Sequence, residues 1–395
     1  RAPVSDLHPA DGPQATPRGC GNTLNFNPPV MVQLIIESLK YFGSEFCIDG
    51  CSFDLTSILC RGSNGALLTK PPLIQAITKD PLLTSTKLIA EPWDAAGAFQ
   101  LGDFALDTPR WGEWNSYFRD DMRRFLRGYG GSKGKFATRL AGSEDLFGHS
   151  KKSPKNSVNF ITCHDGFSLR DLVSYNEKHN TANGEENRDG MNDNDSWNCG
   201  VEGVTTDPEI LALRERQMRN FHLALMLSHG TPMLFMGDEY GHTKEGNNNT
   251  WCQDNRLNWM RWDQLKENEG FYRFYKSLIA FRNANPLLKK PHFFREGDID
   301  WHGTTPFKPH WNQEDQFLAF TLNDHEEGRD IYAAFNSSSQ FMEVEIPAPR
   351  TKKWHWIANT ALPSPDDYKS PPQPIETDVL KYRMAPYSSL LLKGL

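Results

Sequence analysis

Short apolar runs that each end at an acidic residue are the most regular pattern along the chain. Between positions 46 and 57, apolar residues alternate with small or polar ones until Asp54 stands between two apolar neighbours. The same order, a β-rich run followed at once by an acid, recurs at Glu91 and at Asp165. Alternation with a period of two is typical of strands. The pattern predicts three strands that each end at a carboxylate, although Asp54 taken alone is equally consistent with a structural cap.

Helical periodicity separates these runs. Apolar residues recur at helical spacing from Met31 to Phe42, with Asn27 as the expected N-cap and Pro28 as the first helical residue. Further helices are expected over residues 72–78, 166–176, 208–229 and 271–281, and further strand ends over residues 111–115 and 232–236. Later in the chain the pattern changes to short β runs between turns, over residues 317–322, 330–335, 341–346, 353–358 and 388–392.

This alternation of strands and helices predicts an α/β protein. The separations of Asp54 from Glu91 and of Glu91 from Asp165 are close to one and two strand-helix units of about 30 residues each. Such spacing is typical of a (β/α)8 TIM barrel, whose strand ends meet at one rim. We expect a loose segment over residues 1–18, barrel over residues 19–296, and an antiparallel β-sandwich over residues 297–395.

Composition and charge exclude several classes of protein. The net charge is −7 and the 43 Lys and Arg residues form no long basic block, so no nucleic-acid partner is expected. No apolar run approaches the roughly 20 residues that span a bilayer, so no membrane partner is expected either. The seven cysteines are an odd number without metal-ligand spacing, which indicates reduced thiols in a cytosol-like or stromal compartment.

Three aspartates in the polar loop over residues 180–205 suggest a calcium site at first sight. However, the spacing of Asp189, Asp193 and Asp195 does not match an EF-hand loop, and no glutamate closes it. We therefore expect neither a metal nor a cofactor. The three strand-end carboxylates fit a different chemistry, because glycoside hydrolysis with retention needs a nucleophile and an acid/base about 5–5.5 Å apart.

The residues around these acids resemble a known family. Gly50-Cys-Ser-Phe-Asp54-Leu, Ala90-Glu91-Pro-Trp-Asp and Phe160-Ile-Thr-Cys-His164-Asp165-Gly resemble three catalytic regions of the α-amylase superfamily, glycoside hydrolase family 13. Within it, the closest resemblance is to isoamylase-type starch and glycogen debranching enzymes of the plant and algal kind. That likeness rests on Cys20-Gly-Asn-Thr-Leu-Asn, Asp171-Leu-Val-Ser-Tyr-Asn, Ser196-Trp-Asn-Cys-Gly, Arg216-Gln-Met-Arg-Asn-Phe and Met236-Gly-Asp-Glu-Tyr-Gly.

The resemblance implies a role for each residue of the candidate site. Asp54 would be the nucleophile, Glu91 the acid/base and Asp165 the transition-state stabiliser. The side chains expected to bind substrate are His164, Trp93, Ser52, Glu113 and Asn247. The implied ligand is a branched α-glucan such as amylopectin or glycogen, and the implied location is the plastid stroma, with the cytoplasm as the alternative.

The chain departs from the family pattern in its length and at two positions. Asp54 would lie on the fourth barrel strand, and three preceding strand-helix units would need roughly 90 residues, so we expect an N-terminally incomplete barrel with about strands 4–8. Ser52 stands where the superfamily has an arginine that orients the nucleophile. Pro28 stands where relatives tend to have histidine.

Two functions of different classes follow from these observations. The intact acids Asp54, Glu91 and Asp165 favour an enzyme that hydrolyses α-1,6 branch points with retention. Ser52 favours a non-catalytic subunit that binds glucan or modulates a second, active isoamylase subunit. An unrelated barrel enzyme is the weakest interpretation, because it leaves the ordered series of motifs unexplained.

Overall fold

The computed structural model describes residues 23–311, 314–350, 352–375 and 381–395. The predicted loose segment over residues 1–18 lies outside this part of the chain. The described residues divide into two compact units, one formed by residues up to Asn115 with Ser143–Val158, and one by Ser116–Gly142 with Asn159–Leu395. Among the described residues, none of the helices combines the length and hydrophobicity that a bilayer crossing needs.

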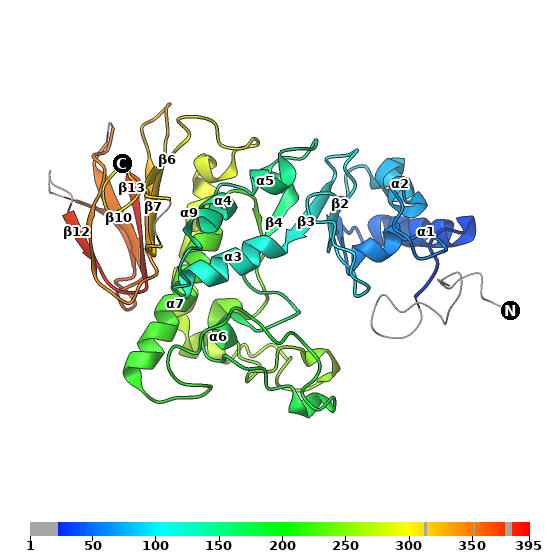
Figure 1. The fold of residues 1–395 in the computed structure, drawn as a ribbon, viewed down its shortest axis with the longest axis horizontal. Coiled ribbons are helices and arrows are strands. Elements are labelled where there is room, and N and C mark those ends of the chain that lie inside the picture. The colour runs from blue at the N-terminus through cyan, green and yellow to red at the C-terminus, as the bar shows by residue number, and fades with distance from the viewer. Residues whose placement is uncertain (1–22, 312–313, 351, 376–380) are drawn as a thin grey trace. The chain divides into compact units, whose positions relative to one another are not determined.

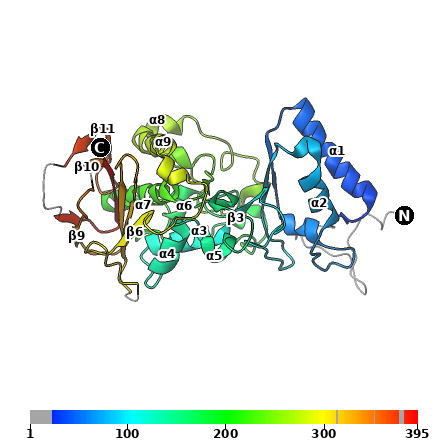
Figure 2. The same cartoon turned by 90° about the horizontal axis from the view of Figure 1, so that it is seen from above.

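Parallel strands covered by helices form the first unit. β1 (Gly50–Phe53) pairs in parallel with β2 (Lys87–Ala90), which pairs in parallel with β3 (Trp111–Asn115). α1 (Pro29–Glu45) and α2 (Pro72–Lys79) lie side by side (Figures 1 and 2). The shorter elements are η1 (Thr56–Cys60), η2 (Pro81–Leu83), α5 (Glu144–Phe147), η3 (Pro154–Asn156) and β4 (Ser157–Asn159), whose last residue belongs to the second unit.

The core of the first unit follows from the period of two along β2. Leu88 and Ala90 are buried, and they pack with α2 residues Leu73, Ile74 and Ile77 in one apolar cluster. Strand residues two apart point to the same face of a sheet. The helix therefore covers that face and leaves the carboxyl ends of the strands to the polar side chains that follow them.

Two local expectations for the first unit were wrong. Asn27 is not the N-cap of α1, because the helix begins at Pro29, Pro28 occupies the cap position, and the Asn27 amide donates instead to the carbonyl of Arg61 at 2.9 Å. The first strand begins at Gly50, and Phe46 and Ile48 precede it with 60% and 40% of their surface exposed. Alternating hydrophobicity was therefore not enough to define the start of this strand.

Helices dominate the first half of the second unit. They are α3 (Ser116–Leu126), α4 (Lys133–Leu140), α6 (Leu169–Leu172), α7 (Pro208–Leu227), α8 (Gln264–Glu267) and α9 (Glu269–Ala284), with the short helices η4 (Thr181–Asn183), η5 (Asp238–Tyr240), η6 (Thr250–Cys252) and η7 (Pro286–Lys289). α7 begins where Asp207 accepts a hydrogen bond from the Glu209 amide at 2.9 Å, and Pro208 stands at the first helical position. α7 then lies beside α9 (Figure 2).

The strand expected over residues 232–236 is shorter than its apolar sequence suggested. β5 covers only Thr231–Pro232, and Leu234 and Met236 beyond it are 39% and 66% exposed. Met233 still donates its amide to the carbonyl of Asn159 at 2.7 Å. A strand needs backbone partners as well as apolar side chains, and Pro232 has no amide hydrogen to donate.

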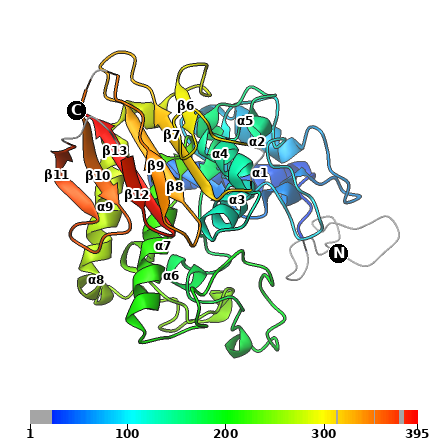
Figure 3. The same ribbon diagram turned by 60° about the vertical axis from the view of Figure 1, so that its left-hand side comes forward.

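Antiparallel strands make up the C-terminal part of the second unit (Figure 3). One sheet has the order β11-β10-β13-β8-β7-β6, and a second pairs β12 with β9. The bounds are β6 (Ile299–His302), β7 (Phe317–Leu322), β8 (Ile331–Asn336), β9 (Met342–Glu345), β10 (Trp354–Asn359), β11 (Tyr368–Pro374), β12 (Lys381–Met384) and β13 (Ser388–Gly394). The five expected β runs are all present, whereas β6, β11 and β12 were not expected. The proposed domain boundary at residue 297 stays a prediction.

Every residue of β7 and β8 is buried, because the large sheet packs on both faces. On one face, Phe320 and Phe335 join the cluster formed by the helices α3, α4, α7 and α9. On the other face, Phe317 and Tyr332 pack with Val344 of β9 in a separate cluster. The two sheets therefore form a sandwich. The face of the large sheet that points away from the small sheet packs against the helices.

Substitution of Phe136 tests how the helices pack against the large sheet. It stacks on Phe125 of α3, with ring centroids 4.1 Å apart, and meets the edge of Phe335 of β8 at 5.2 Å. Phe136→Ala should lower the free energy of unfolding by about 3–5 kcal/mol, measured by urea denaturation, because it leaves a cavity between helices and sheet. The control Phe341→Ala, at a residue that is 56% exposed, should change it by less than about 0.5 kcal/mol. Equal effects from the two variants would contradict this packing.

Candidate active site

The register of β1 and β2 brings two of the predicted catalytic acids together. Phe53 lies opposite Ala90 in the parallel ladder, and Asp54 and Glu91 follow these two residues directly. A carboxylate oxygen of Asp54 lies within 4.8 Å of one of Glu91. This separation suits a retaining glycosidase, whose two carboxyl groups lie about 5–5.5 Å apart, better than an inverting one, which needs about 6.5–9.5 Å.

Glu91 is held firmly, whereas Asp54 is exposed. Glu91 is 2% exposed, and its Oε2 accepts a hydrogen bond from the Leu55 amide at 2.8 Å. Its carbonyl oxygen accepts a second bond from the Thr56 amide at 2.9 Å. Leu55 has a left-handed backbone, φ 43° and ψ 48°, which is costly for a residue with a branched side chain. The two bonds to Glu91 stabilise this tight turn, so that the turn carrying Asp54 is shaped by the neighbouring acid.

Ser52 and Trp93 lie close to these acids in the chain and differ in their surroundings. Ser52 is exposed on β1, two positions before Asp54, so the two side chains start from the same face of the strand. The Trp93 ring stacks against Phe99, with centroids 6.4 Å apart and planes 14° apart. Asp94 binds Arg61 through two hydrogen bonds of 2.7 and 3.1 Å, which anchors the loop after Glu91.

Glu113, which was predicted to bind substrate, is fully occupied by contacts within the protein. It is fully buried at β3, where it pairs with the buried ammonium of Lys152 and accepts a hydrogen bond from the Gly102 amide at 2.7 Å. Burial is the main cause that raises the pKa of this carboxyl. The predicted contact with substrate stays untested, and the contacts present are those of a structural ion pair.

Asp165 and His164 lie in the second unit, on a segment that is tied down at three points. Both side chains are exposed, and His164 Nε2 lies 3.7 Å from Asp165 Oδ1. Asp238 accepts hydrogen bonds from the Thr162 hydroxyl and from the Leu169 amide, the latter at 2.9 Å, so one carboxylate closes the segment at both ends. Between them, the Gly166 amide donates to the carbonyl of Asn248 at 2.9 Å.

The loop over residues 246–249 is bound to the loop over residues 180–190 by amide side chains. Asn247 is buried, and its Nδ2 donates to Asn183 Oδ1 at 2.8 Å. Asn180 Nδ2 donates to Asn248 Oδ1 at 2.8 Å, while the Asn248 amide returns a bond to Asn180 Oδ1 at 3.0 Å. Asn247 thus orders the loop from within, and its predicted role in binding substrate stays a prediction.

The aspartates considered for calcium each have partners within the protein. Asp195 binds Arg124 at 2.9 Å and Arg127 at 2.8 Å. Asp189 Oδ2 accepts hydrogen bonds from the Asn183 and Asn249 amides, and Asp193 accepts one from the Asp195 backbone. These contacts tie the three carboxylates to the surrounding loops.

Two buried acids in these loops were assigned no role from the sequence. Asp238 lies just after β5, and Asp171 of α6 accepts hydrogen bonds from the Thr243 hydroxyl at 2.5 Å and the Lys244 amide at 2.7 Å. Both carboxyls are fully buried, and burial raises the pKa of each. Both acids lie in segments that resemble the isoamylase family, and this resemblance was the only sign of their importance in the sequence. Their hydrogen-bond partners lie too far away in the chain to be identified from the sequence.

Comparison with known proteins shows which proteins this chain is similar to. A family model described as "Isoamylase 1-3, C-terminal" matches residues 300–392. The chain is 51% identical over 379 residues to isoamylase 3, chloroplastic, of Oryza sativa subsp. japonica, covering 95% of this chain and 47% of that protein. It is 44% identical over 407 residues to isoamylase 1, chloroplastic, of Arabidopsis thaliana, covering 95% and 51%. A glycogen debranching enzyme of Enterobacter sp. is 40% identical, covering 85% and 50%.

Solved structures of pullulanases share the fold. That of Anoxybacillus sp. has a TM-score of 0.71 at 19% identity and covers 99% of this chain and 49% of its own. That of Bacillus acidopullulyticus has a TM-score of 0.67 at 18% identity and covers 96% and 42%. The predicted fold class, strands of a (β/α)8 barrel followed by an antiparallel β-sandwich, is confirmed.

The chain is thus a member of the α-amylase superfamily, as its motifs predicted. Within that superfamily it is of the isoamylase type. It spans about half the length of the curated relatives it matches.

Asp238 makes the stability of the second unit depend on pH. Burial raises its pKa to about 7, above the value of about 4 expected in the unfolded chain. Its contribution to folding is therefore complete below pH 4 and is lost as the pH rises to about 7. Between pH 5 and pH 8, the free energy of unfolding of the natural protein should fall by about 2 kcal/mol more than that of Asp238→Asn. Urea denaturation at both pH values measures this, with the exposed Asp193→Asn as control; identical falls in all three proteins would contradict it.

Proposed function

We propose that the protein is an isoamylase-type glycoside hydrolase that cleaves the α-1,6 branch points of amylopectin or glycogen with retention. The observation that carries this proposal is the approach of Asp54 and Glu91 to within 4.8 Å at adjacent ends of two parallel strands. The similarity to isoamylases and to a glycogen debranching enzyme supports the choice of the α-1,6 bond, since the carboxylates alone do not determine which bond is cut.

In the proposed mechanism the two acids exchange roles between two steps. Asp54 attacks the anomeric carbon of the branch while Glu91 gives its proton to the departing glycosidic oxygen, so the main chain leaves with a free 6-hydroxyl group and the branch becomes a glycosyl ester of Asp54. Glu91, now ionised, removes a proton from water, which attacks the same carbon and releases Asp54. Asp165 would stabilise the positive charge of the oxocarbenium-like transition state, with His164 beside it.

The proposed substrate and location follow the relatives. Branched α-glucan is the ligand proposed, with Trp93, Ser52, Glu113 and Asn247 as the side chains assigned to it from the sequence. Since the isoamylases of Oryza sativa and Arabidopsis thaliana are both named chloroplastic, we place the protein in the plastid. Within the plastid, we propose the stroma, as the family resemblance implies.

Ser52 supports a second candidate function. A carboxylate nucleophile benefits from a fixed cation beside it, and a serine hydroxyl supplies no charge. In the alternative, the protein binds glucan or assembles with an active isoamylase without cutting bonds itself. The two functions differ in one measurable property, which is turnover by this protein without a partner.

The first test compares branched and linear glucan, using the protein as its source organism makes it. It should release linear chains from amylopectin and leave amylose almost untouched, measured as new reducing ends. Asp54→Asn should lower kcat by more than about 10³, because an amide cannot form the glycosyl ester. Asp107→Asn, an exposed aspartate of the same unit, is the matched control and should keep full activity. Efficient cleavage of amylose would instead assign the protein to the endo-α-1,4 enzymes.

The second test introduces a cation at position 52. Ser52→Arg should raise kcat for amylopectin by about 10²-fold, because a guanidinium on the same strand face as Asp54 favours and orients its ionised form. Ser52→Gln, which is long but uncharged, should give no such gain, and thermal melts show whether both variants fold. If neither the natural protein nor Ser52→Arg cuts amylopectin, yet both alter the rate of an active isoamylase when mixed with it, the subunit function replaces the enzyme.

A further inference from the structure

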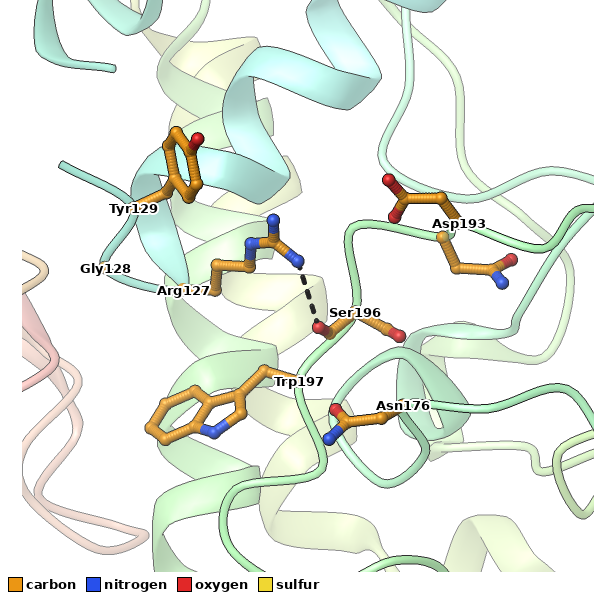
Figure 4. Close-up of a pocket in the computed structure, with 8 residues that line it drawn as sticks. Arg127, Gly128, Tyr129, Asn176, Asp193, Ser196 and Trp197 are labelled. Carbon is orange, nitrogen blue, oxygen red and sulfur yellow. Dashed lines mark hydrogen bonds between the residues drawn. The ribbon is translucent and has the colours of Figure 1, made fainter. Parts of the chain in front are cut away.

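A polar cavity of about 380 Å³ lies in the second unit, and none of the residues that line it is assigned to catalysis. It is formed where the chain leaves α3 and where the loop before α7 passes it (Figure 4). The residues that line it are Arg127, Gly128, Tyr129, Asn176, Asp193, Asn194, Ser196 and Trp197. Its volume lies within the range of about 300–1,000 Å³ that small-molecule sites occupy.

The cavity has an aromatic side and a polar side. Figure 4 shows the rings of Tyr129 and Trp197 on one side, and the side chains of Asp193 and Asn176 on the other. Tyr129 is 58% exposed although the Arg127 guanidinium lies 5.6 Å from its ring centroid. The Trp197 ring is fixed from behind by Tyr387, with centroids 4.8 Å apart. The Tyr129 ring is therefore largely exposed at the cavity, and the Trp197 ring, which is partly buried, is held in place beside it.

The charges at the cavity do not favour an anion as its ligand. Arg127 Nη2 binds Asp195 Oδ1 at 2.8 Å, and Arg127 Nη1 donates to the Ser196 carbonyl at 3.4 Å. The guanidinium is thus already paired with a carboxylate. Asp193 is exposed at the opposite side and would repel an anion. The groups that remain suited to a ligand are ring faces, one carboxylate and one amide.

A pyranose ring is the chemical class that matches this set. Its faces carry C–H groups that pack on aromatic rings, and its equatorial hydroxyls donate to carboxylates and exchange hydrogen bonds with amides. We propose that this cavity is a second glucan-binding site, distinct from the catalytic acids, which holds an outer chain of the same branched polymer. This inference rests on the proposed function for the identity of the polymer.

Such a site acts by raising the local concentration of substrate. Once one chain of a branched polymer is bound, its other chains meet the enzyme at an effective concentration set by the polymer, so overall affinity rises without a new contact at the catalytic acids. A short branched oligosaccharide that fills the catalytic site has no further chain to offer to the cavity and gains nothing. The two kinds of substrate therefore separate the second site from the first.

The experiment truncates the exposed groups of the cavity. Tyr129→Ala and Asp193→Asn should each raise KM for amylopectin about five- to tenfold, while kcat and KM for a short branched oligosaccharide stay unchanged. Both variants should also be less retarded in native gels that contain amylopectin. Tyr129→Phe keeps the ring and should behave as the natural protein does. Phe341→Ala, which removes an equally exposed ring from the C-terminal sheet region, is the matched control.

The outcomes separate this inference from the proposed function. If Tyr129→Ala and Asp193→Asn fold, bind amylopectin and cleave it as the control does, the second site is refuted while the enzyme stands. If no form of the protein cleaves amylopectin but Tyr129→Ala still loses retardation in the gel, the enzyme is refuted and the second site stands. An equal rise in KM for the short oligosaccharide would also refute the inference, because it would place Tyr129 at the catalytic acids.

Discussion

The parallel pairing of β1 with β2 is the constraint on which the candidate active site depends. Because Phe53 lies opposite Ala90, the residues that follow them, Asp54 and Glu91, leave the sheet at the same level. A shift of the pairing by one residue would move one carboxylate by about 3.3 Å and turn its side chain to the other face. The hydrogen bond from the Leu55 amide to Glu91 then closes the turn that carries Asp54. Backbone pairing, rather than contact between the two acids, sets their separation.

Buried carboxylates play a similar part in the second unit, where the backbone is irregular. Asp238 joins the two ends of the segment that carries His164 and Asp165, and Asp171 holds the chain at Thr243. Asparagine side chains connect the remaining loops. Such groups are expensive to bury, and their hydrogen bonds to backbone amides offset that cost only while the loops keep this arrangement. The same bonds that order the loops therefore make a change of loop conformation costly.

Much of this architecture was predictable from local sequence. An acid after a short β-rich run marked the ends of β1 and β2, and apolar periodicity marked the helix over residues 208–229 that the structure contains as α7. The bonds to Asp238 were not predictable, because its partners lie 69 and 76 residues away in the chain. β11 was missed because its sequence, YKSPPQP, is rich in proline and exposed, which is unusual for a strand. The buried pairing of Glu113 with Lys152 was missed for the same reason as Asp238, since it joins residues 39 positions apart.

The central claim is that Asp54 forms a covalent bond to the sugar during turnover. A fluorinated maltosyl fluoride, which forms the glycosyl ester quickly and loses it slowly, traps that intermediate, and mass spectrometry of the digested protein locates it. The account predicts one added maltosyl group on the peptide that carries Asp54, and none in Asp54→Asn. A label on Glu91 or Asp165 instead, or no label on a protein that cleaves amylopectin, would contradict the account.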